Sequence, residues 1–130
     1  MKYIHGSPSE TYCAPILGNG EISLQIGADG SMSPDGSGKL IHANIGRCIW
    51  WEGRRYRGFD TKPLIPFGRF TQRVGKLSPI ESEQRLDPES AEISCSTVYS
   101  DGTRIETLAL LHTDMNLIVV KKRFFPASQG

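Results

Sequence analysis

The stretch ISCSTVYSDGTRIETLALL, residues 93–111, decides the fold that we predict for this 130-residue chain. Polar and apolar residues alternate on both sides of Asp101-Gly102, and β-branched and aromatic residues are frequent, which is typical of β-strands. Asp-Gly is a preferred pair for a two-residue hairpin turn. The stretch therefore predicts an antiparallel hairpin.

A two-residue turn in this hairpin pairs Cys95 with Leu108 and Ile93 with Leu110. One face of the ribbon is then apolar away from the turn, and the polar turn end projects past the core. We expect Cys95 to be a small buried residue rather than a nucleophile.

The segment that follows the hairpin is apolar at four successive positions, Leu117-Ile118-Val119-Val120. A strand tolerates such a run when both of its faces are covered, so we predict a central strand here. A helix over residues 108–125 is disfavoured by the β-branched residues and by the lack of a cap and an apolar stripe. Residues 126–130 are expected to form a tail.

The N-terminal half predicts further strands separated by glycine turns. Residues 1–14 are expected to be an extended lead-in, and Gly18-Asn19-Gly20 a left-handed turn. In residues 21–27 Ile22, Leu24 and Ile26 alternate with polar residues and are predicted to face inward. A second turn is expected at residues 28–31.

The middle of the chain predicts a second hairpin, formed by residues 45–51 and 54–59 around Glu52-Gly53. A strand is expected over residues 67–74, and Pro66 confines its start to a sheet edge or a strand end. Residues 81–87 are predicted to be a polar edge segment.

Composition supports one turn-rich β domain. The chain has 14 glycines and 8 prolines, 38% hydrophobic residues and a net charge of +1. Because no strong positive field exists, we expect no nucleic-acid partner and no binding to an anionic membrane. No apolar segment resembles a secretory signal or a membrane helix, so we expect a cytoplasmic protein, or an exported one whose signal has been removed.

No catalytic, cofactor-binding or metal-binding residue is predicted. The three cysteines, Cys13, Cys48 and Cys95, are odd in number and show no Cys-x-x-Cys spacing. The histidines, at positions 5, 42 and 112, are scattered, and no metal-ligand motif or nucleophile elbow occurs.

Sugar contact is the one chemical theme that the sequence supports. Carbohydrate sites combine a flat aromatic ring with planar polar side chains, and five neighbouring residues could provide both. These candidate oligosaccharide-contacting residues are Trp50, Trp51, Glu52, Arg54 and Tyr56. The alternative is structural packing, since a tryptophan usually serves a core or an interface, and adjacent tryptophans in a strand point to opposite faces.

Four segments carry a family resemblance: PILGNGEI at residues 15–22, EQRLD at 83–87, YSDGT at 99–103 and DMNLIVV at 114–120. Their order resembles the N-terminal β-domain, or supersandwich, of glycoside hydrolases with an (α/α)6 catalytic barrel, a group that includes α-L-fucosidases and maltose-phosphorylase relatives. Residues Glu106-Thr107-Leu108 depart from the family pattern.

The resemblance implies an all-β antiparallel sandwich with little or no helix, spanning residues 1–130 as one domain or as its N-terminal part. It implies a non-catalytic region of a glycoside hydrolase, inactive alone, whose partner is a C-terminal helical-barrel catalytic domain of the same polypeptide. The alternatives are a stand-alone carbohydrate-binding β-sandwich and a structural or interaction domain without a ligand.

Overall fold

The protein is described by a computed structural model for residues 3–5, 14–32, 49–52, 64–72 and 74–127. These residues form nine β-strands and contain no helix, which confirms the predicted all-β antiparallel class. No helix in this part of the chain could cross a membrane. The strands are β1 Tyr3–His5, β2 Ile16–Gly18, β3 Ile22–Gln25, β4 Ile49–Glu52, β5 Leu64–Gly68, β6 Pro79–Asp87, β7 Glu92–Tyr99, β8 Arg104–Leu111 and β9 Ile118–Phe125.

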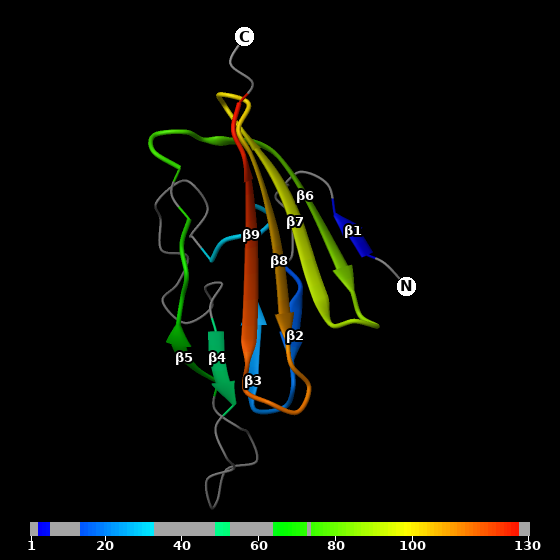
Figure 1. The fold of residues 1–130 in the computed structure, drawn as a ribbon. Coiled ribbons are helices and arrows are strands. Elements are labelled where there is room, and N and C mark those ends of the chain that lie inside the picture. Colours follow the sequence, from blue (N-terminus) through cyan, green and yellow to red (C-terminus); the bar gives the residue numbers. More distant parts are fainter. Residues whose placement is uncertain (1–2, 6–13, 33–48, 53–63, 73, 128–130) are drawn as a thin grey trace, which may run out of the picture.

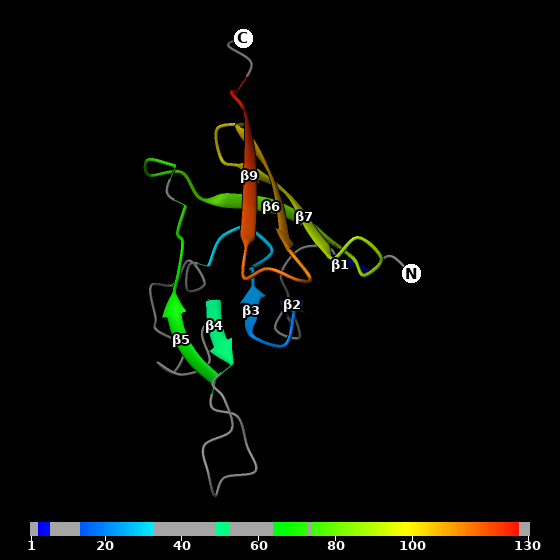
Figure 2. The same cartoon turned by 60° about the horizontal axis from the view of Figure 1, so that its bottom comes forward.

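Two antiparallel sheets make up the fold (Figure 1). A five-stranded sheet has the order β1-β6-β7-β8-β9, and a four-stranded sheet has the order β2-β3-β4-β5. In Figure 1, β2 and β3 lie behind β8 and β9. β4 and β5 lie beyond β9, on the side away from β8 (Figures 1 and 2). The four-stranded sheet therefore extends sideways past β9.

The core lies where the two sheets overlap. Its buried residues come from β2, β3 and the turn after β3 on one side, and from β7 and β8 on the other. The alternation predicted for β3 holds for Ile22, Leu24 and Ile26, which are all buried, although Ser23 on the opposite face is buried as well. The core residues are Leu17, Ile22, Leu24, Ile26, Met32, Ile93, Cys95, Ala109 and Leu111.

The β7–β8 hairpin exists as predicted, but its register differs by one residue. The amide of Gly102 donates to the Tyr99 carbonyl at 2.9 Å, the Tyr99 amide donates to the Thr103 carbonyl at 2.8 Å, and Gly102 has φ of 88°. This is a three-residue loop in which a glycine in the left-handed region closes the turn. Cys95 consequently pairs with Thr107 and not with Leu108.

A shift of one residue moves every side chain of a strand to the other face. On β8 the buried residues are Ile105, Thr107, Ala109 and Leu111, whereas Leu108 and Leu110, which we predicted on the core face, lie on the outer face and are half-buried.

The positions of two strands within the five-stranded sheet correct the predictions. β9 is an edge strand of the described sheet and not a central strand. β6, which we predicted as an edge segment, lies inside the sheet between β1 and β7. The predicted lead-in contains β1, whose residue Ile4 pairs with Arg85 of β6.

The four-stranded sheet corrects the second predicted hairpin. β4 pairs with β3 on one side and with β5 on the other, so both of its edges are occupied by strands other than residues 54–59. Residues 54–59 themselves lie outside the described part of the chain. β5 begins before the expected strand and contains Pro66 on the edge of the sheet, which agrees with the edge position predicted for this proline.

The predicted turn after β3 anchors one sheet to the other. The Gly27 amide donates to the Ser31 carbonyl at 2.8 Å, and the Gly30 amide donates to the Gly27 carbonyl at 2.9 Å. Gly30 has φ of 72°, and a Cβ atom built there would lie 2.5 Å from the Thr107 Oγ1 of β8. A glycine is therefore needed at position 30 both for its backbone conformation and for the close approach of the sheets.

Candidate functional site

The two tryptophans of the predicted sugar site point to opposite faces of β4, as expected for neighbours in a strand. Trp50 pairs with Ser23 and is 8% exposed, whereas Trp51 pairs with Ile22 and is 43% exposed. The two rings therefore do not form a common platform, and Trp51 is the one whose ring is open to solvent. Glu52 ends β4 opposite Leu64.

Arg54 and Tyr56, the other two predicted contacts, lie outside the described residues. Sugar contact by the predicted set as a whole stays a prediction.

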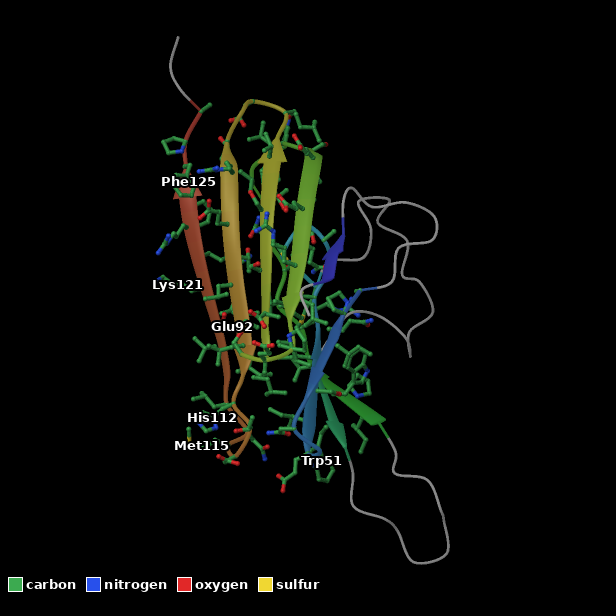
Figure 3. All side chains as sticks on the ribbon, turned by 90° about the vertical axis from the view of Figure 1, so that its right-hand side faces the viewer. Trp51, Glu92, His112, Met115, Lys121 and Phe125 are labelled. Carbon is green, nitrogen blue, oxygen red and sulfur yellow. The ribbon has the colours of Figure 1, made fainter. Side chains whose placement is uncertain are left out.

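Two turns that Asn19 joins place polar groups at the end of the sandwich that carries Trp51 (Figure 3). The Asn19 Oδ1 accepts hydrogen bonds from the amides of Glu21 at 3.0 Å and Ile22 at 2.9 Å, which closes the β2–β3 turn. Its Nδ2 reaches the β8–β9 loop and donates to the carbonyls of His112 and Met115, both at 3.2 Å. One amide side chain therefore holds together two turns that are more than ninety positions apart in the chain.

Other contacts fix the same loop. The Asn116 Nδ2 donates to the Glu21 carboxylate at 2.6 Å, and its Oδ1 accepts from Asn19 at 3.2 Å. Within the loop, the His112 Nδ1 accepts from the Asp114 amide at 3.1 Å. We call Asn19, Glu21, His112 and Asn116 the turn cluster.

Exposed apolar side chains lie at the same end of the sandwich as the turn cluster. Met115 is 50% exposed and Leu117 is 46% exposed, both in the β8–β9 loop. Figure 3 places Trp51 at the same end of the sandwich as His112 and Met115, on the other sheet. Ile65 pairs with Trp51 and is also exposed. This end combines fixed amide and carboxylate groups with uncovered apolar surface, which suits the docking of a partner surface or the stacking of a sugar ring.

A second polar area lies on the outer face of the five-stranded sheet, where the strands enclose a depression of about 340 Å³. Arg85 forms an ion pair with Glu83 at 2.7 Å, and Arg104 contacts Glu106 at 3.5 Å. We call this area the outer depression, and such a charged outer face is also what a solvated sheet presents. Its lining residues are Glu83, Arg85, Ser94, Cys95, Ser96, Glu106, Thr107, Leu108, Lys121 and Arg123.

Between the sheets lies a polar group, the Lys122 ammonium, that we did not predict from the sequence. The ammonium of Lys122 donates to the Gly30 carbonyl at 2.9 Å, to the Thr107 Oγ1 at 3.0 Å and to the Gln72 Oε1. Burial lowers the pKa of Lys122. The strand period could have indicated this, because it places Lys122 on the same face as Val120.

Cys95 is buried, as predicted, and is held in its thiol form. Burial raises its pKa to about 11, against the opposing effect of the Gln84 Nε2, which lies 3.3 Å from the Cys95 Sγ. The same Nε2 donates to the carbonyls of Ile26 at 3.2 Å and Gly27 at 3.1 Å. Because a thiolate is the reactive form, this environment gives Cys95 a structural role.

The described residues contain no group of three or more His, Cys, Asp and Glu side chains that could hold a metal ion. Comparisons of the chain with protein-family models, with curated proteins and with solved structures give no match.

Proposed function

We propose that the chain is a non-catalytic N-terminal β-domain of a glycoside hydrolase, which packs on a helical-barrel catalytic domain and supports it. The observation that carries the proposal is the contact made by Asn19. This residue lies in the first segment of the family resemblance, and it hydrogen-bonds to Met115 and Asn116 in the last segment. Two short motifs that are distant in the sequence thus form one structural unit.

The surface around this unit also supports the proposal. Trp51, Ile65, Met115 and Leu117 are large apolar residues, and each exposes more than two fifths of its surface. Clustered exposed apolar residues beside polar groups are typical of surfaces that contact another domain. Packing of a barrel against this end would cover Trp51, whereas the outer depression lies on the outer face of the five-stranded sheet.

The described nucleophilic and basic groups between the sheets have structural partners. The Cys95 thiol has a raised pKa, and the Lys122 ammonium is bound by three acceptors. Neither side chain is poised to act on a substrate, which agrees with chemistry located on another domain.

Activity and accessibility measured together test the proposal. The isolated 130 residues are expected to release no product from a panel of aryl glycosides, whereas a polypeptide that continues through a following helical barrel is expected to do so. In a Trp50→Phe background, acrylamide should quench the fluorescence of Trp51 in the isolated chain and quench it less in the longer polypeptide. Hydrolysis by the isolated chain, or equal quenching of Trp51 in both proteins, would contradict the proposal.

The second candidate function is a stand-alone carbohydrate-binding module, which the open ring of Trp51 favours. It predicts a saturable fluorescence change when oligosaccharides are added to the isolated chain. Trp51→Ala should abolish this change, and Trp50→Phe should preserve it because Trp50 is buried. A chain that shows no change with any oligosaccharide tested argues for the supporting domain.

A further inference from the structure

The described sheets have four edge strands, and β9 differs from the other three. β1 and β2 have three residues each, and β5 has five residues and contains Pro66. Short strands and prolines limit pairing with a further strand. β9 has eight residues and contains neither proline nor glycine, so it presents the longest row of free backbone hydrogen-bonding groups at a described edge.

The side chains of β9 give this edge a distinct chemical pattern. Lys121 and Arg123 are exposed on the outer face, and Figure 3 shows Lys121 on the side away from the four-stranded sheet. Val120, Lys122 and Phe124 alternate with them on the inner face, where Lys122 is bound to the turn after β3. The outer face of this edge therefore carries two exposed cations between the exposed apolar residues Val119 and Phe125, and the only cation on the inner face of β9 is Lys122, which is already bound.

The four-stranded sheet offers further surface beside this edge. Its strands β4 and β5 lie past β9 in two views (Figures 1 and 2), and the cross-strand pair Trp51 and Ile65 is exposed there. Both residues share the sheet face of Ile22, which is the face turned toward the five-stranded sheet. A strand that pairs with β9 and continues past Ile118 would extend the five-stranded sheet toward Trp51 and Ile65.

Charge argues against the pairing of β9 along its whole length with β9 of a second copy of the chain. In a two-fold antiparallel pairing of β9 with itself, centred on Lys122, that lysine would face its own copy, and Lys121 would face Arg123. Like charges directly opposite each other in a sheet are destabilising. The two exposed cations, Lys121 and Arg123, favour a strand that carries carboxylates.

We propose that β9 binds one further antiparallel β-strand from a partner polypeptide, in which acidic residues alternate with apolar residues. The acidic residues lie opposite Lys121 and Arg123, and the apolar residues lie opposite Val120 and Phe124. Backbone hydrogen bonds supply much of the affinity, and the alternation supplies the specificity. This inference does not rest on the proposed function, because it concerns the edge of the sheet and not the turn cluster.

The test uses two synthetic probes, capped eight-residue peptides in which valine alternates with glutamate or with lysine. Amide hydrogen exchange of residues 118–125 is followed by NMR while each peptide is added to the 130-residue chain. The Val/Glu peptide is expected to slow exchange in β9 and to bind on the order of tenfold more tightly than the Val/Lys peptide, because two opposite-charge pairs replace two like-charge pairs.

A matched variant makes the test specific. The double substitution Lys121→Glu/Arg123→Glu changes two exposed side chains and is expected to fold, which circular dichroism checks. It should reverse the preference, so that the Val/Lys peptide binds more tightly. Equal affinities of the two peptides, protection outside β9, or dimerisation of the free chain through β9 in analytical ultracentrifugation would overturn the proposal.

Discussion

Replacement of Gly30 by alanine should separate two physical costs at one position. Gly30 has φ of 72°, a conformation that costs a residue with a Cβ about 1–2 kcal/mol. The new Cβ would also lie 2.5 Å from the Thr107 Oγ1 and 2.8 Å from the Thr107 Cβ. Overpacking of this kind typically costs about 1–3 kcal/mol. We therefore expect Gly30→Ala to lower the free energy of unfolding by about 2–5 kcal/mol.

Relaxation at this site is restricted because Thr107 cannot move away without loss of another contact. Its Oγ1 accepts a hydrogen bond from the Lys122 ammonium at 3.0 Å, and its backbone lies inside the five-stranded sheet opposite Cys95. A change in the Thr107 rotamer therefore cannot relieve the clash with the new Cβ, and its cost should be measurable as a loss in the free energy of unfolding.

Gly20 provides the matched control. It has φ of 89°, but a Cβ built there meets no atom within 4 Å. Gly20→Ala should thus show the backbone cost alone, about 1–2 kcal/mol. Urea unfolding followed by circular dichroism gives both values, and the difference of about 1–3 kcal/mol is the contact between the sheets. Equal losses for the two variants would refute the inferred close approach of Gly30 to Thr107.

Three further predictions follow from the polar contacts. Asn19→Ala should cost about 1–3 kcal/mol in urea unfolding and should speed amide exchange in residues 112–117, because both turns lose its hydrogen bonds; unchanged exchange there would contradict the link. Lys122→Met should cost about 1–3 kcal/mol since three acceptors lose their donor, whereas Lys121→Met, at an exposed site, should change stability by less than about 0.5 kcal/mol. The Cys95 thiol has a pKa near 11 in the folded protein against a reference value of 9.0, so its full contribution to stability is present below pH 9. About 2–3 kcal/mol of the free energy of unfolding should be lost as the pH rises through 11. Cys95→Ala should flatten this part of the stability–pH curve, and a curve for the variant that runs parallel to that of the unsubstituted protein would contradict the burial of the thiol.

The strands of the C-terminal half could be predicted from the sequence, but their register could not. On β7 the apolar residues Ile93 and Cys95 lie on one face and serines alternate with them, so only one face can be the core face, and the prediction of that face is confirmed. On β8 the run from Leu108 to Leu111 is apolar on both faces, so it fits either register. The loop length then decides, and Asp101-Gly102 is compatible with loops of two and of three residues.

The edge position of β9 was missed for a different physical reason. An apolar run such as residues 117–120 indicates that the faces of a strand are covered, but it does not indicate whether both backbone edges are hydrogen-bonded. Val119 is in fact exposed on the outer face. The turn cluster was missed because the contact between Asn19 and the β8–β9 loop joins distant segments, and only their arrangement in space reveals it.

The long-range links of Asn19 and Lys122 bear on how the chain reaches its native state. Asn19 contacts a carbonyl 93 positions later, and Lys122 contacts the Gly30 carbonyl 92 positions earlier. During synthesis from the N-terminus, the first layer emerges long before the strands that cover it. Its apolar residues stay uncovered until β7 and β8 have been synthesised, so we expect slow folding of this core and sensitivity to chaperones that bind unfolded chains.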